Sequence, residues 1–426
     1  MQPTTEAERI GSLDELRGFA LLGILLLNIL GFGLPSAAYS FPGFDLDGTL
    51  TADLIAWASV ELFAEGAMRG LFSMLFGAGV LLFTQGASGT GGRDAGLHYR
   101  RTFWLLAFGL FDGYVLLWNG DILVSYALAG AVLYWMRNLS ARTLLVLAGV
   151  LLILMSVLHL FIADQMSAGR LASLTIEQTT AGVRVDESLQ QQAAVWEDFS
   201  TSYFLTSGEV AAELEARRGS YASAFSWNLQ ANTEMLLFVL PVFLFWDALA
   251  FMLIGMALFK LGVLQGGRTD KFYLGLMLAG FSVGLLVNGI EVWRGISSGM
   301  ELTSIFAQMQ WTYHLGRLGM SLGYVGLLLL LWRQARLAQF RRLLAATGRM
   351  ALSNYLLQSL ICLFLFTGAG LALVGELSRA ELYPIVFGIW VFQLAFSRWW
   401  LGRFRFGLLE WVWRALTYGR LPPLVR

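Results

Sequence analysis

Three polar side chains near the start of the chain have types and a spacing that could do chemistry inside a membrane. Asp14 and Arg17 precede an apolar run at residues 19–27, and Asn28 follows that run. In a helix, the 11 steps from Arg17 to Asn28 turn through roughly 1100°, or three turns plus about 20°, so the three side chains share one stripe. Polar groups within lipid are costly and usually face a protein interior or a watery cavity. The stripe is therefore the first candidate site.

Other ionisable residues fall within or beside apolar segments. An unpaired charge at the middle of a membrane costs roughly 3 kcal/mol or more, so these groups should pair with one another or meet water. A structural ion-pair network and a path for a substrate or for protons both account for them. The residues are Arg69, Asp112, Asp121, Asp247, His314 and Arg317.

Two amides, Asn354 and Gln358, lie four residues apart and so share one helix face. Such amides often only join neighbouring helices, although they also line substrate sites. The three histidines match no metal-ligand spacing, so we expect no metal site. The single cysteine, Cys362, lies in an apolar run and is expected to serve packing.

The composition is that of an integral membrane protein. The chain has 426 residues, of which 57% are hydrophobic and 14% are charged, whereas soluble proteins carry about 25% charged residues. The formal net charge is zero, and nothing indicates a nucleic-acid partner. We therefore expect an all-α fold, a polytopic transmembrane helix bundle.

Apolar runs of about 20 residues predict about ten membrane spans. Two shorter amphipathic segments, 49–65 and 399–417, are expected to lie along the membrane surface. The predicted spans are 17–33, 67–85, 103–119, 121–137, 142–162, 236–259, 272–292, 309–332, 350–374 and 382–398.

The distribution of lysine and arginine predicts the orientation of these spans. With the N-terminus inside, the inner segments hold 21 of the 29 basic residues, the outer segments hold six, and two fall within or at the edge of spans. This asymmetry predicts that both termini are cytoplasmic.

The largest segment between spans, 163–235, is acidic and divides the chain. Residues 1–162 are expected to form a five-span bundle that carries the Asp14, Arg17 and Asn28 stripe. Residues 236–426 form a second five-span bundle with an interfacial C-terminal helix. The segment 163–235 is placed outside the membrane, where it either caps an outer cavity or is a solvated linker.

Five longer motifs carry a family resemblance. They are SLDELRG at 12–18, LFSMLFG at 71–77, WNGDIL at 118–123, GRMALSNY at 348–355 and FGLLEWVWR at 406–414. With these motifs in this order, nearly the whole chain resembles the YeiB-like bacterial membrane proteins (domain of unknown function 418). The resemblance implies a multi-pass protein of the bacterial plasma (inner) membrane. The chain departs from the family pattern at Leu408, where proline is usual, and at Asp112, where relatives often carry histidine.

The first span also resembles a wider superfamily of transmembrane acyltransferases, which move acyl groups from an inner coenzyme A thioester. In one branch the place of Asn28 holds a histidine general base, and in another the histidine comes about eleven residues later, where this chain has Tyr39. Asparagine cannot accept a proton at working pH, but it can donate a hydrogen bond to an oxyanion. A base would have to come from Asp112, Asp121 or His314.

The leading hypothesis is a membrane protein on this acyltransferase-like scaffold that transfers or binds an acyl group or a lipid-like substrate. Acyl-coenzyme A is the one cofactor considered, with its phosphates near Arg17. The expected partners are membrane lipids and a small-molecule or acyl-donor substrate, and a homodimer is left open. The alternatives are a small-molecule transporter and a non-catalytic binding or assembly protein. The catalytic candidates are Asn28, Asp112, Asp121 and His314, and the substrate-binding candidates are Asp14, Arg17, Arg69, Asp247, Arg317, Asn354 and Gln358.

Overall fold

Helices account for most of the chain that the structure describes, which in this computed structural model is residues 11–85, 95–178, 186–203 and 205–426. Within these residues there is no β-strand, only one isolated bridge between Phe404 and Val425. The all-α prediction is confirmed. Arg9, Arg93 and Arg184, which the orientation prediction counts, lie outside the described residues.

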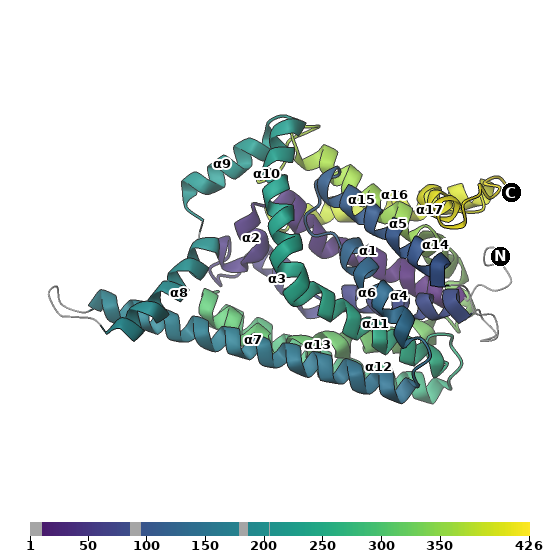
Figure 1. Ribbon diagram of the computed structural model, residues 1–426, viewed down its shortest axis with the longest axis horizontal. Coiled ribbons are helices and arrows are strands. Elements are labelled where there is room, and N and C mark those ends of the chain that lie inside the picture. The colour runs from purple at the N-terminus through teal and green to yellow at the C-terminus, as the bar shows by residue number, and fades with distance from the viewer. Residues whose placement is uncertain (1–10, 86–94, 179–185, 204) are drawn as a thin grey trace.

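The elements follow one another with short connections (Figure 1). They are α1 (Gly11–Gly33), α2 (Ser36–Ser40), η2 (Pro42–Phe44), α3 (Ala52–Phe63), α4 (Ala67–Gln85), α5 (Ala95–Tyr114), α6 (Leu123–Met136), α7 (Ala141–Gln178), α8 (Glu187–Tyr203), α9 (Ser207–Arg218), α10 (Tyr221–Glu234), the π-helix η3 (Met235–Leu244), α11 (Phe245–Lys260), α12 (Asp270–Ser297), α13 (Leu302–Leu331), η4 (Ala335–Leu337), α14 (Ala338–Arg349), α15 (Ala351–Phe366), α16 (Leu382–Arg403) and α17 (Leu408–Tyr418).

Helices lie at all ten predicted spans, but fewer of them are long and apolar enough to cross a membrane. Seven stretches of the described chain pass that test, or eight if α14 and α15, which are bent by 79°, count as one span. α5 begins with the polar sequence AGLHYRR. α6 has only 14 residues, which is about 21 Å of helix against a hydrocarbon core of about 30 Å. Length and composition therefore support seven or eight spans rather than ten.

α1 runs through the middle of the bundle and contacts α4, α14, α15 and α16 (Figure 1). Leu16, Leu21 and Leu25 on this helix are fully buried. Two glycines allow α14 to approach closely: a Cβ on Gly18 would overlap the Leu344 carbonyl, and one on Gly348 would overlap the Asp14 carbonyl. Small residues let helix backbones come together in membranes.

Glycines also bring α4 and α11 together. A Cβ on Gly77 would overlap the carbonyl oxygen of Met252, and one on Gly255 would overlap that of Met74. Gly77 and Gly255 therefore allow the backbones of the two helices to approach closely. Gly79, one half-turn further along α4, has nothing within 4 Å of its Cβ position.

The start of α1 and the C-terminus lie at the same end of the bundle (Figure 1). Loops predicted to be on the inner side contact one another there. The Lys260 ammonium donates to the carbonyls of Arg137 and Leu139, and Arg333 pairs with Asp270. This end is called the inner end below; its cytoplasmic placement stays a prediction.

The segment 163–235 folds onto the opposite, outer end. α7 has 38 residues, or roughly 57 Å of helix, so it extends well past the length of a membrane span, and α8 packs against it. On α9, the Arg217 guanidinium donates to the carbonyls of Gly31, Phe32 and Leu34 and to the Glu213 carboxylate. Because the last carbonyls of a helix lack helical partners, Arg217 caps the end of α1. α9 is therefore docked onto the outer end of α1.

Candidate functional site

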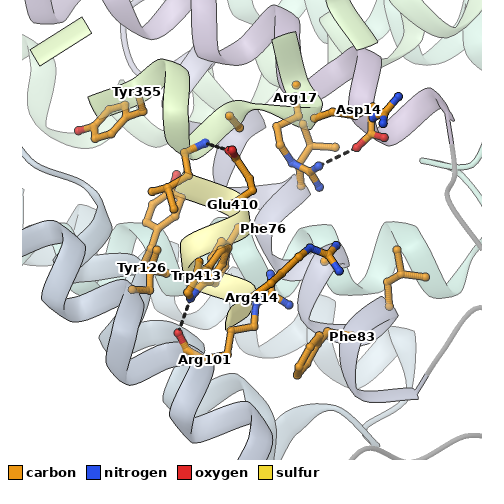
Figure 2. A pocket seen from close by; sticks show the side chains of 18 of the residues that line it. Asp14, Arg17, Phe76, Phe83, Arg101, Tyr126, Tyr355, Glu410, Trp413 and Arg414 are labelled. Atoms are coloured by element: carbon orange, nitrogen blue, oxygen red, sulfur yellow. Dashed lines mark hydrogen bonds and ion pairs between the residues drawn. The ribbon is translucent and has the colours of Figure 1, made fainter. Parts of the chain in front are cut away.

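A cavity of about 250 Å³ opens at the inner end, and we call it the inner cavity. Its walls come from α1, α4, α5, α6, α14, α15 and α17, so segments from both halves of the chain build it. Figure 2 shows aromatic side chains, Tyr126 and Tyr355, toward one end and the charged groups of Asp14, Arg17 and Arg414 toward the other. The inner cavity therefore has a polar part and an apolar part.

The polar part is rich in arginine. Four arginines and two carboxylates line the cavity, which leaves a net charge of +2. Arg17 donates to Asp14 at 2.8 Å, and both side chains remain partly exposed. The Arg101 guanidinium lies 4.5 Å from the ring centroids of both Phe83 and Trp413, a cation–π geometry that fixes its position. The other two arginines are Arg349 and Arg414.

The second carboxylate, Glu410 of α17, holds the start of α15. It accepts hydrogen bonds from the backbone N–H groups of Leu352 and Ser353 at 2.7 and 3.0 Å and from the Ser353 hydroxyl at 2.6 Å (Figure 2). A carboxylate at a helix N-terminus satisfies N–H groups that lack helical partners and is favoured by the helix dipole. Burial raises the pKa of the Glu410 carboxyl, and the hydrogen bonds from α15 act against that rise.

The apolar part is formed by side chains of α4, α5 and α6, including Phe72, Leu75 and Leu105. The open space beside Gly79 belongs to this wall. Tyr126 and Tyr355 form its deep end, and each is almost fully buried. Such a surface suits the hydrocarbon part of a ligand.

Asn28 does not line the inner cavity, although Asp14 and Arg17 do. It is half-buried further along α1, so the stripe predicted from the sequence is divided in the structure. Tyr39, at the later position of the acyltransferase pattern, lines a separate cavity of about 30 Å³ at the outer end, together with Arg217 and Trp227.

The predicted candidates Asp112 and Asp121 lie together behind Tyr355. Asp112 is fully buried and Asp121 nearly so. The two carboxyls interact with each other and with the Tyr355 hydroxyl. That hydroxyl in turn accepts hydrogen bonds from the Trp118 indole at 3.2 Å and the Ile122 N–H at 3.3 Å. Tyr355 therefore separates the acidic pair from the cavity.

Four other candidates, Arg69, Asp247, His314 and Arg317, belong to a group of charged residues that we call the outer charged cluster. Hydrogen bonds connect this cluster to Tyr126 of the inner cavity. The Tyr126 hydroxyl lies 2.6 Å from the Ser73 hydroxyl and donates to the Arg69 carbonyl. Arg69 pairs with Asp247 at 3.3 Å and donates to the Tyr313 hydroxyl at 3.0 Å. The cluster consists of Glu61, Glu65, Arg69, Asp247, Glu291, His314 and Arg317.

Arg317 is the centre of the other half of this cluster. Its guanidinium lies 3.5 Å from Glu61, 3.6 Å from Glu65 and 4.0 Å from Glu291. Glu291 and Asn288, near the outer end of the apolar run at 272–292, are both buried. Their side chains face α3 and α13 rather than solvent, since Asn288 donates to the Glu61 carbonyl and Glu291 accepts from Thr312.

The amides of Asn354 and Gln358 join α15 to its neighbours. Asn354 donates to the Thr347 carbonyl and the Ser397 hydroxyl, and Gln358 donates to the Gln393 amide oxygen at 2.9 Å. These contacts support the interpretation that the two amides join neighbouring helices. Neither residue lines the inner cavity.

Sequence reasoning did not find several residues that the structure brings to these sites. Glu61 and Glu65 lay in a segment expected at the membrane surface. Tyr126 and Tyr355 lie within predicted spans, and no spacing to other polar residues marks them as site residues. Glu410 stood out only as part of the motif at 406–414, whereas in the structure its hydrogen bonds reach α15.

Comparison with known proteins places the chain in a family. A family described as "Protein of unknown function (DUF418)" matches residues 258–420. The protein YeiB of Escherichia coli (strain K12) is 32% identical over 424 residues, covering 98% of each chain. The chain belongs to the YeiB-like DUF418 family. YxaH of Bacillus subtilis (strain 168) is 30% identical over 430 residues, covering 100% of this chain and 98% of the relative. Both relatives bear the description "uncharacterized".

No solved structure matches the chain. The part matched by the family description contains α14, α15 and α17, which supply Arg349, Tyr355 and Glu410 to the inner cavity. The full-length relatives also cover α1, α4, α5 and α6, which supply the rest of its walls. Family membership confirms the predicted resemblance. The relation to acyltransferases stays a prediction.

Proposed function

We propose that this multi-pass helical membrane protein binds an anionic acyl compound in the inner cavity and uses a coenzyme A thioester there as the donor for acyl transfer. The observation that carries the proposal is the division of one cavity into an arginine-rich mouth with a net charge of +2 and an apolar wall. Arginine is well suited to phosphate because its planar guanidinium makes paired hydrogen bonds. The apolar wall offers burial to hydrocarbon, at about 0.8 kcal/mol per CH₂ group.

The size of the cavity limits which part of the donor enters. At about 250 Å³, it is near the lower end of small-molecule sites, which span roughly 300–1,000 Å³. The acyl chain and thioester fit this space, while the phosphates of coenzyme A remain at the mouth beside Arg17 and Arg414. An acidic phospholipid has the same combination of anionic group and acyl chain, so binding experiments must distinguish the two.

The test uses two glycines and two arginines as matched pairs. Gly79→Leu adds a side chain at a position of the cavity wall where nothing lies within 4 Å of the Cβ, whereas the Cβ of Gly77→Leu would overlap the Met252 carbonyl. Arg17→Ala removes a cavity arginine, while Arg342→Ala removes an exposed arginine of α14 outside the cavity. Binding of acyl-coenzyme A to the purified protein in detergent is measured for each folded variant, with free coenzyme A and phosphatidylglycerol as competitors.

We expect Gly79→Leu to abolish binding of the acyl thioester. Arg17→Ala should weaken it at least about tenfold, because a hydrogen bond to a charged group contributes roughly 1.5–3 kcal/mol. Arg342→Ala should leave the affinity unchanged. Acyl-coenzyme A binding that is absent, or equal in wild type and Gly79→Leu, would overturn the proposal. Binding of phosphatidylglycerol alone would assign the cavity to lipid instead of a thioester donor.

Transport is the second candidate, and the outer charged cluster is the observation that favours it. Four carboxylates there meet only two arginines, and intramembrane ionisable groups of this kind often form substrate or proton paths. Asp247 contacts both Arg69 and His314. A transporter should lose proton or substrate flux in vesicles on Asp247→Asn but not on Asp164→Asn, which changes an exposed residue of α7. Equal flux in both variants would exclude this path.

A further inference from the structure

The two carboxyls of Asp112 and Asp121 are brought together by a glycine on α5. Asp121 packs against Gly109, where its Oδ2 would lie 2.6 Å from a Cβ. Gly109 precedes Asp112 by three residues, so both face the same side of α5. The Val124 N–H donates to the same Oδ2 at 2.9 Å and holds Asp121 in this position. Gly109 on α5 and Val124 at the start of α6 therefore hold the two carboxyls next to each other.

The pair is short of hydrogen-bond donors. Within hydrogen-bond geometry, no donor in the described part of the chain reaches either oxygen of Asp112 or Oδ1 of Asp121. The neighbouring groups from α15 are the hydroxyls of Tyr355 and Ser359 and the thiol of Cys362.

No arginine or lysine is among the described groups that interact with either carboxyl. Two adjacent carboxylates without a cation, buried in an apolar setting, would repel each other and lose hydration. A single proton between them removes one charge and supplies the missing donor.

We propose that Asp112 and Asp121 share one proton and form a proton relay that reaches the inner cavity through the Tyr355 hydroxyl. Tyr355 is the only member of the three that lines the cavity among its described lining residues. The pair therefore exchanges protons with a bound molecule without contacting it. Among the base candidates Asp112, Asp121 and His314, the geometry favours the acidic pair, because His314 lies with Asp247 in the outer charged cluster.

The role of this relay in acyl transfer rests on the proposed function. An acceptor hydroxyl attacks the thioester carbonyl, a C–O bond forms and the C–S bond breaks. The hydroxyl proton passes through Tyr355 to the singly protonated pair, and the pair returns one proton to the departing thiolate. The products are an acyl ester and free coenzyme A thiol, so atoms and charges balance and no oxidant or reductant is required.

The shared proton is tested by infrared difference spectroscopy of the full-length protein in lipid. Subtracting the spectrum of Asp112→Asn from that of wild type should reveal the C=O stretch of one protonated carboxyl, which shifts in D₂O. Asp121→Asn should remove the same band, because an asparagine N–H replaces the proton as donor. Asp164→Asn, on the exposed face of α7, is the matched control and should leave the spectrum unchanged.

A wild-type spectrum without this band, or a band that persists in the Asp112→Asn, Asp121→Asn double variant, would overturn the shared proton. Loss of only half the signal in each single variant would also contradict it, because each carboxyl would then hold its own proton. The spectrum needs no ligand, so it separates this inference from the proposed function. If wild type shows the band but binds no acyl thioester, the shared proton between Asp112 and Asp121 is supported. The proposal that a coenzyme A thioester is the acyl donor is then wrong.

Discussion

The inner cavity and the outer charged cluster contain the same kinds of side chain but use them differently. In the cavity, arginines outnumber carboxylates and Arg17 keeps a quarter of its side chain exposed. In the cluster, carboxylates outnumber arginines and Arg317 is 2% exposed. The charge of Arg17 is therefore accessible to a ligand, whereas the charge of Arg317 is surrounded by neighbouring carboxylates. Removing a cluster charge should affect stability, and removing a cavity charge should affect binding.

The largest effect is expected at Arg317. Arg317→Met leaves Glu61, Glu65 and Glu291 without their common cation. Breaking a buried ion pair by removing one partner costs about 3–5 kcal/mol, because the remaining charge stays buried. Thermal unfolding in detergent should show this loss as a large fall in Tm.

The matched control for that experiment is Arg294→Met, which changes an exposed arginine at the outer end of α12. Its Tm should stay close to that of wild type. If both variants unfold at the wild-type temperature, Arg317 does not stabilise the carboxylates around it. The proposed difference between the cluster and the cavity would then be wrong.

A smaller effect is expected at Glu410, a cavity residue with a structural task. Glu410→Ala leaves the N–H groups of Leu352 and Ser353 without an acceptor at the start of α15. Losing a helix cap of this kind costs about 1–2 kcal/mol. Chemical denaturation should detect the loss. Glu376→Ala, which removes a carboxylate that is more than half exposed and paired with Arg218, should cost clearly less, and the reverse order would contradict the capping role.

The smallest effect on stability is expected at Arg17. Its partner Asp14 is three residues away on the same helix and partly exposed, and such pairs contribute about 1 kcal/mol or less. Arg17→Ala should therefore unfold within a few degrees of wild type while its affinity for the acyl thioester falls. A Tm loss as large as that of Arg317→Met would show that the mouth of the cavity is structural rather than free for a ligand.

The parts of the site that could be predicted are those that depend on one helix. Asp14 and Arg17 form the predicted pair because residues three apart on a helix are neighbours. The ionisable residues expected to pair within the membrane do so at Arg69, Asp247 and Arg317. The number of spans was overestimated, because an apolar run such as α6 can be a buried helix too short to cross a membrane.

The parts that could not be predicted depend on which helices meet. Nothing in the sequence near Glu410 indicates that it caps α15, since the two lie 57 residues apart. The burial of Glu291 could not be predicted because its partner Arg317 comes from another helix. Asn28 lies on the predicted face of α1, yet the cavity does not extend to it.

By itself, the sequence determined that this is a helical membrane protein of the YeiB-like family, and it located Asp14 and Arg17 on one helix face. Composition and helical periodicity are local properties, so they are readable without a structure. Only the tertiary structure decided that α17 closes a cavity around Arg17, that Gly109 allows Asp121 to reach Asp112, and that three glutamates surround Arg317. The reason is that the neighbours of a helix face are set by close approaches between distant segments, which periodicity along one helix does not encode.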